Sequence, residues 1–295
     1  MYAWNSNKLL VSYSPQHPLY GSNKRRQDYI KFVNHLRNVI GDESEVVLQD
    51  QSPIWIRDWY PIQLSQSQIL FRVATDYMDA QETSDVLHHQ TLLRSSFHSQ
   101  PTFLQPRKPI VSSEIILDGG NVVMDDRHVL ISSKVFRDNP SFSASELEYE
   151  LASIFEDRKL VFIDAEPDDP TGHADGQMQF LADGILVIND LSVVQPRLWK
   201  SNLRQLSALD LLLVTLPYQP LDKTVAGWPV MNGNYINFTA TSRDIAISSY
   251  GDIDTENDIR SLLGTSDPLR RQIHFLRSRV LDCLGGGLHC VTWNA

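Results

Sequence analysis

The sequence predicts an α/β fold in which short strands and helices follow one another in a repeated order within one domain. A strand, strand, helix, strand order recurs several times, and no linker of different composition separates the repeats. The 295 residues, 42% of them hydrophobic, are enough to bury a full core. Units of this kind can close into a ring, although no residue-by-residue period is visible. We therefore interpret residues 1–295 as a single domain.

The first third of the chain opens as strand, helix, strand. Apolar residues recur at helical spacing between Arg26 and Ile40, and short apolar runs lie on both sides of them. Taken alone, the segment Trp55–Asp58 has the ordinary interpretation of a strand end. The polar segment 79–108 is either a long loop or a short helix with a mobile flank. The predicted elements here are strands at 8–14, 45–48 and 69–74 and a helix at 26–40.

The best-marked helix follows Pro140. Ser143 and Glu146 form a capping box, in which the hydroxyl and the carboxylate satisfy free backbone donors at the helix start, and Leu147 and Leu151 begin a buried stripe. Turn residues such as Asp118-Gly119-Gly120 separate the strands before it. The remaining predictions are three strands within 114–135, strands at 160–163, 179–181, 185–188, 211–216, 235–239, 245–248 and from 280 onward, and helices at 196–206 and 258–263.

Composition excludes several classes of protein. The formal charge is −10, and no basic cluster is longer than Lys24-Arg25-Arg26, which argues against nucleic-acid binding. Neither 18 consecutive apolar residues nor a signal-like start is present, so we expect no membrane span, no signal peptide and a cytoplasmic protein. Two cysteines, Cys283 and Cys290, are too few for a disulfide framework and indicate a reducing compartment.

Four segments contain residues that could carry chemistry, and each also has an ordinary structural interpretation. Arg57 and Asp58 could form a surface ion pair, Asp118 could begin a turn, His173 could be a satisfied structural histidine, and Cys290 could be a buried free thiol. The tail is unusual because three consecutive glycines, Gly285 to Gly287, lie shortly before Cys290. Glycines allow close approach of the backbone to a ligand. The segments are Trp55–Pro61, Asp118–Asn121, Gly172–Gly176 and Gly285–Thr292.

Together these segments supply a thiol, an imidazole and two or three carboxylates. Cysteine with histidine is typical of a thiol hydrolase, in which the thiolate attacks and the imidazole moves protons. Metal binding is disfavoured because only His173 and Asp175 lie at ligand spacing. A neutral peptide bond does not require two carboxylates in the site, which disfavours a general cysteine peptidase. Two carboxylates suit a cationic substrate, because they compensate its charge.

The order W-x-R-D, D-G-G-N, G-H-x-D and G-G-G-x-H-C-x-T, over residues 55 to 292, resembles the agmatine deiminase and peptidylarginine deiminase group of guanidine-modifying enzymes. The resemblance implies a five-bladed α/β propeller, the pentein fold, built of ββαβ-like repeats. It also implies that Cys290 is the nucleophile, that His173 is the general acid and base, and that Asp58 and Asp175 grip the guanidinium and take part in catalysis.

Three further segments are interpreted through the resemblance. Trp55 is a candidate for substrate binding. Asp118 is another, although it stands where many agmatine deiminases have glutamate. The stretch Gly233–Phe238 also resembles part of the family pattern, and we interpret it as structural.

The function that the resemblance implies is hydrolysis of agmatine to N-carbamoylputrescine and ammonia, a step of putrescine biosynthesis, through a covalent thiouronium intermediate. No metal or organic cofactor is expected. The expected partner is a small cationic guanidino compound or an arginine side chain, and a homo-oligomer is compatible with the sequence. The alternatives are a peptidylarginine or free arginine deiminase, an amidinotransferase, and a guanidinium-binding protein without turnover. Product analysis distinguishes them.

Overall fold

We describe the protein from a computed structural model. The structure describes residues 8–13, 21–40, 46–49, 54–74, 77–95, 108–156, 158–167, 169–220, 224–225, 228–229 and 231–294. No helix among these residues has both the length and the apolar character needed to cross a membrane.

Five three-stranded sheets form the framework of the described part of the chain. In each sheet the middle strand pairs antiparallel with the first strand and parallel with the third. The sheets are β17(Thr292–Asn294)-β1(Leu9–Ser12)-β2(Val46–Gln49), β3(Ile62–Gln63)-β4(Gln68–Arg72)-β5(Ile110–Ile116), β6(Val122–Met124)-β7(His128–Ser132)-β8(Lys159–Ile163), β9(Met178–Ala182)-β10(Ile185–Asn189)-β11(Leu212–Leu216) and β14(Thr239–Ala240)-β15(Asp244–Ser248)-β16(Gln272–Leu276).

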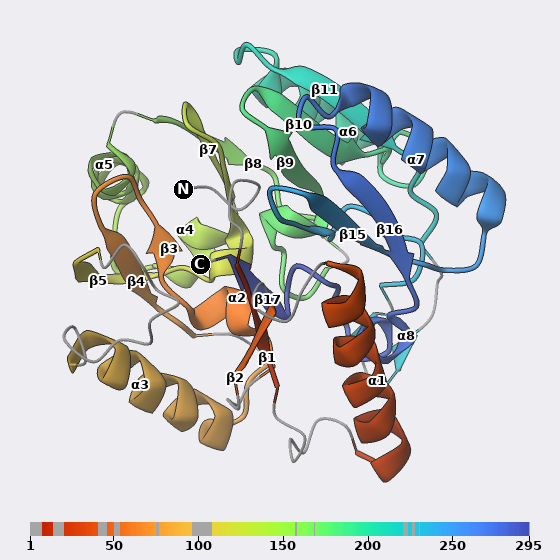
Figure 1. Ribbon diagram of the computed structural model, residues 1–295. Helices are drawn as coiled ribbons and strands as arrows, with labels where there is room; N and C mark the ends of the chain where they lie inside the picture. The colour runs from red at the N-terminus through yellow and green to blue at the C-terminus, as the bar shows by residue number, and fades with distance from the viewer. Residues whose placement is uncertain are drawn as a thin grey trace.

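A helix joins the second strand of every sheet to the third, because parallel neighbours need a crossover connection. These helices lie at the periphery of the molecule, outside the sheets (Figure 1). They are α1(Asn23–Val39), α3(Ala80–Ser95), α5(Ala144–Phe155), α6(Pro196–Leu206) and α7(Ile253–Ser266). Shorter elements are the helices α2(Ile56–Trp59), α4(Lys134–Asp138) and α8(Arg279–Asp282), the 3₁₀ turns η3(Gly119–Asn121) and η4(Ala174–Gly176), and the pair β12(Thr224–Val225)-β13(Trp228–Pro229).

The two ends of the chain close the ring. Strand β17, near the C-terminus, pairs antiparallel with β1, so that Leu10 faces Trp293 and the last strand completes the first sheet. Each ββαβ unit therefore forms one blade, and the predicted α/β propeller of repeated units is confirmed (Figure 1). The predicted helices at 26–40 and 196–206 and the capping box of Ser143 and Glu146 are present.

The sequence predictions were wrong at three places. In the segment interpreted as a strand end, Ile56–Trp59 forms a short helix with Trp55 at its N-cap. Most of 235–239 is irregular, with only Thr239–Ala240 in a strand. The segment from Val280 is a short helix, and the returning strand is Gln272–Leu276. The first two places lie in connections that carry buried polar side chains, and Val280 packs in the hydrophobic core around α1. Within 79–108, α3 is a four-turn helix, longer than expected, and residues 96–107 lie outside the described part.

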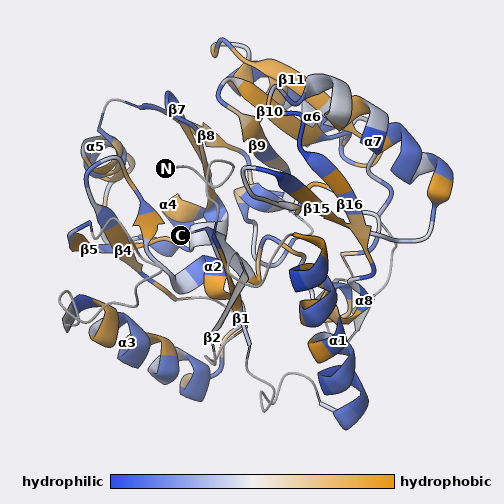
Figure 2. Ribbon diagram, in the orientation of Figure 1, coloured by the Kyte–Doolittle hydropathy of each residue, from blue (hydrophilic) through white to orange (hydrophobic). Residues whose placement is uncertain are grey.

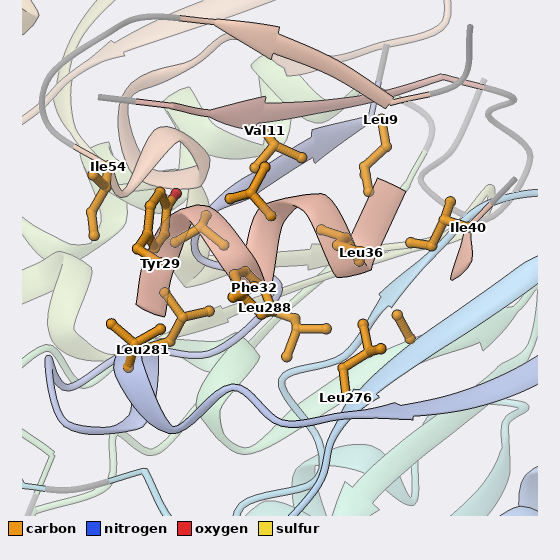
Figure 3. Packing of buried hydrophobic residues seen from close by; sticks show 14 of the residues in the cluster. Leu9, Val11, Tyr29, Phe32, Leu36, Ile40, Ile54, Leu276, Leu281 and Leu288 are labelled. Atoms are coloured by element: carbon orange, nitrogen blue, oxygen red, sulfur yellow. The ribbon is translucent and has the colours of Figure 1, made fainter. Parts of the chain in front are cut away.

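The core that holds the C-terminal segment is built around α1. Tyr29, Val33 and Leu36 of this helix are fully buried and pack with Leu281 and Leu288 (Figure 3). Strands β9 to β11 are largely hydrophobic, whereas α1 and α3 carry hydrophilic residues on much of their surface (Figure 2). Because Leu288 is anchored in this cluster two residues before Cys290, the core of one blade fixes the position of the tail cysteine.

Candidate active site

All of the candidate residues lie in equivalent places of the repeat. Each connection from the third strand of one blade to the first strand of the next passes the ring axis, and neighbouring connections contact one another, as α2 with η3 and η3 with η4. The five connections contribute, in chain order, Trp55–Trp59, Asp118–Asn121, His173–Gly176, Asn234–Phe238 and Gly287–Val291. Radial repetition therefore brings together residues that are more than 200 positions apart in sequence.

One cavity collects most of the predicted site residues. Trp55, Asp58, His173, Asp175 and Cys290 all line it. Asp118 is not among the lining residues and lies behind His173. The structure thus brings the thiol, the imidazole and two carboxylates to one space, as the sequence predicted.

The glycines of the motifs are explained by close packing rather than by turns alone. A Cβ on Gly120 would lie 2.6 Å from Oδ1 of Asp58 and 2.7 Å from Nδ1 of His173. A Cβ on Gly286 would lie 2.3 Å from the Trp55 ring. Both glycines let the backbone approach side chains of the cavity, which no residue with a Cβ permits.

His173 is held between two carboxylates. Its Nε2 lies 3.0 Å from Oδ2 of Asp118, and its Nδ1 lies 3.6 Å from Oδ1 of Asp58. Burial alone would lower the pKa of His173, but Asp58, Asp118 and Asp175 outweigh burial and raise the pKa to about 10. The imidazole is therefore protonated at neutral pH and can donate a proton.

Asp118 acts on His173 from the side away from the cavity. It is buried, and its Oδ2 also lies 3.5 Å from Nζ of Lys134. Burial raises the pKa of Asp118, but the hydrogen bond and charge of His173 and the charge of Lys134 lower it below its usual value. Asp118 is therefore an anion that fixes the orientation of the imidazole.

Asp58 has two donors that hold its carboxylate. The backbone N–H of Gly120 donates to Oδ1 at 3.0 Å, and the Tyr77 hydroxyl donates to Oδ2. Burial raises the pKa of Asp58 to about 6, against the lowering effect of His173. Asp58 therefore remains largely ionised at neutral pH.

Asp175 is oriented by His289, a residue whose role the sequence did not reveal. Nδ1 of His289 lies 2.7 Å from Oδ2 of Asp175. Burial, and secondly the charge of Arg57, lowers the pKa of His289 to about 4, so the ring is neutral and Nδ1 carries the proton that Oδ2 accepts. A neutral donor fixes the carboxylate without cancelling its charge.

Cys290 is close to Asn237, which the sequence analysis interpreted as structural. Oδ1 of Asn237 lies 3.4 Å from the Cys290 sulfur and accepts from the backbone N–H of His289 at 3.0 Å. Burial, followed by the charges of Asp175 and Asp58, raises the pKa of Cys290 well above its usual value. The stretch Gly233–Phe238 resembles part of the family pattern, but no local signal indicates that Asn237 contacts the cysteine; its place in the fourth connection does.

The fold and the site define a class of protein, a pentein-type deiminase. The family model of Porphyromonas-type peptidyl-arginine deiminase matches residues 20–295, and the chain belongs to that family. It is thus a hydrolase acting on C–N bonds of amidines. A comparison with curated proteins finds no match.

Solved structures share the fold at low sequence identity. An agmatine deiminase of C. jejuni has a TM-score of 0.78 and 17% identity, over 99% of this chain and 93% of that one. An agmatine deiminase of Enterococcus faecalis has a TM-score of 0.73 and 14% identity, over 98% and 93%. A DDAH from Pseudomonas aeruginosa has a TM-score of 0.58 and 10% identity, over 99% and 100%.

Substitution of His289 tests its positioning of Asp175. The change His289→Leu removes a buried hydrogen bond to a charged group, so kcat/KM for a guanidino substrate should fall by about tenfold or more. The change His289→Asn supplies an amide N–H near the place of Nδ1 and should restore most of the loss. Steady-state kinetics measure both. Equal losses in the two variants would show that the ring contributes packing only.

Proposed function

We propose that the protein hydrolyses a guanidinium group to a ureido group and ammonia through a covalent intermediate on Cys290. The observation that carries this proposal is that Cys290, His173, Asp58 and Asp175 line one cavity. A binding protein without turnover has no use for a thiol in that position.

The carboxylates explain how a cation can be enclosed. A guanidinium group stays charged at all physiological pH values, and its burial without anions would be strongly unfavourable. Asp58 and Asp175 supply two anions whose oxygens match the planar N–H groups of a guanidinium. Trp55, whose ring packs against Gly286, supplies a flat apolar wall of the same cavity. This pairing places the central carbon of the substrate for attack by sulfur.

Binding of the cation also activates the nucleophile. In the free protein the thiol is neutral, because burial and the charges of Asp175 and Asp58 raise its pKa. A bound guanidinium compensates both carboxylates, and the protonated His173 adds a second positive charge. Cys290 therefore loses its proton to solvent when substrate is bound, rather than before.

The proposed steps balance in atoms and charge. The Cys290 thiolate adds to the guanidinium carbon, His173 protonates one nitrogen, and the C–N bond breaks to release ammonia and leave an S-alkylthiouronium cation. The neutral His173 then takes a proton from water, whose oxygen adds to the same carbon. The C–S bond breaks, the ureido product forms, and the thiolate and protonated histidine are restored. The proton lost from the added oxygen goes to solvent, where the released ammonia becomes ammonium by taking up one proton.

Agmatine is the substrate that the rim of the cavity favours. Asp169 and Glu82 line this cavity, and no lysine or arginine side chain lines it among the described residues. A second cation on the substrate suits this rim better than the carboxylate of free arginine. The C. jejuni agmatine deiminase that shares the fold has also been solved as a cysteine-to-serine variant with substrate bound. The product would be N-carbamoylputrescine, and we place the protein in cytoplasmic putrescine biosynthesis.

Arginine within a peptide is the second candidate, because the family is described by peptidyl-arginine deiminase activity. The two candidates differ in what is attached to the guanidino group. Ammonia release from agmatine, arginine, blocked arginine esters and arginine peptides ranks them, and a new guanidino product in the presence of an amine would instead indicate amidino transfer.

Replacement of the nucleophile tests the chemical step. The variant Cys290→Ala lacks the sulfur that forms the intermediate, so ammonia release from the best substrate of the screen should fall to background. The matched control is Cys283→Ala, because Cys283 is the other free cysteine and does not line the cavity. This control should retain parental activity. Turnover near the parental rate in Cys290→Ala would refute the proposed mechanism.

Substitution at the rim tests the preference for a second cation. The variant Asp169→Asn removes one charge but keeps the oxygen that accepts from the backbone N–H of Thr171. KM for agmatine should rise about two- to fivefold, while KM for a blocked arginine ester should not change. Asp190→Asn is the control, because Asp190 makes the same kind of turn with Ser192 away from this cavity. An equal change for both substrates would contradict the assignment.

A further inference from the structure

A second cavity, the axial cavity, lies along the ring axis beyond the active site. It has a volume of about 90 Å³. Residues from the first strand of every blade line it, from β3, β6, β9, β14 and β17. It shares no lining residue with the active-site cavity. Arg57 and His289 lie in its wall, while their neighbours in sequence, Asp58 and Cys290, line the active site. These four residues therefore form the partition between the two cavities.

The two cavities have opposite charge. Asp58, Asp175 and the rim acids line the active site, whereas no acidic side chain among the described residues lines the axial cavity. Burial lowers the pKa of Arg57 to about 10, so its guanidinium is still charged at neutral pH. Its side chain donates to neutral acceptors, the backbone carbonyl of His289 at 3.4 Å and Oδ1 of Asn294 at 3.1 Å. The lining of the cavity therefore has a net positive charge in a protein of formal charge −10, although Asp175 and Asp58 act on the Arg57 guanidinium from the active-site side.

Gln179 gives the axial cavity a second hydrogen-bond donor. This residue of β9 is 8% exposed, and its Nε2 is buried without a hydrogen-bond partner among the described residues. Buried polar atoms in folded proteins almost always have a partner, so an amide N–H of this kind indicates a group that accepts from it. The remaining wall is largely apolar and includes Phe180 and Trp293.

We propose that the axial cavity binds a small monovalent anion, a halide ion or a short carboxylate, between Arg57 and Gln179. One buried cation and one amide donor match one negative charge, and a divalent anion would be left with uncompensated charge. The apolar wall favours weakly hydrated anions, because they lose less solvation on entry. The site is separate from substrate binding, and it exists whether or not the proposed deiminase reaction is correct.

The test uses bromide and chloride as probes on the whole protein without substrate. Bromide can be located in crystals by its anomalous scattering, and chloride binding broadens the chloride NMR line in solution. We expect an anomalous peak in the axial cavity within hydrogen-bond distance of Arg57 and Gln179. We also expect the protein to broaden the chloride NMR line. Added iodide or acetate should remove this excess width by competing for the site, and added sulfate should not. A cavity that holds water alone, with no bromide peak, would overturn the proposal.

The variant Gln179→Leu removes the donor without breaking any hydrogen bond of the described structure. It should weaken chloride binding by about fivefold, the value of one hydrogen bond, and leave ammonia release and the unfolding temperature near their parental values. Gln205→Leu is the control, because Gln205 lies on α6 away from the axial cavity. Unchanged excess line width in Gln179→Leu would contradict the assignment even if the variant is fully active.

Discussion

The buried negative charge around Cys290 is the constraint on which the rest of the site depends. Burial, followed by the charges of Asp175 and Asp58, raises the pKa of Cys290, because each opposes ionisation of the sulfur. The same two carboxylates are what a guanidinium requires in a buried place. In the proposed mechanism, the arrangement that keeps the free thiol neutral also allows a bound cation to promote ionisation of the sulfur. His173, whose pKa the surrounding carboxylates raise to about 10 against the effect of burial, is the proton donor in that proposal.

The propeller explains how such a concentration of charge is held in place. Each connection between blades passes the axis and contributes one or two polar residues, and the blades outside it supply the cores that fix the backbone. Secondary contacts then orient each acid: Asp58 through Gly120 and Asp175 through the neutral ring of His289. Buried carboxylates with defined donors keep their geometry, whereas loosely held ones would be neutralised or would rotate. The ring thus holds several buried charges close together in a fixed arrangement.

The sequence predicted the repeat and the four ordered motifs because these leave local signals. Helical spacing, the capping box at Ser143 and the glycine run before Cys290 are visible without coordinates. The role of Asp118 could not be predicted, because its position behind His173 depends on the packing of two adjacent blades. Asn237 and His289 were missed as site residues for the same reason. The helix at Ile56–Trp59 was not predicted, because it is short and packs against η3, which lies about 60 residues later in the sequence.

The central claim is that Cys290 ionises only when a cation occupies the site. The most direct measurement compares alkylation of the protein by neutral chloroacetamide and by cationic chloroacetamidine, each rate divided by the rate with free cysteine at neutral pH. The account predicts that the cationic reagent is favoured by about tenfold or more, equivalent to at least one pKa unit, and that Cys290→Ala abolishes the difference. Equal normalised rates, with fast reaction of the neutral reagent, would show a thiolate already present in the free protein and would contradict the account.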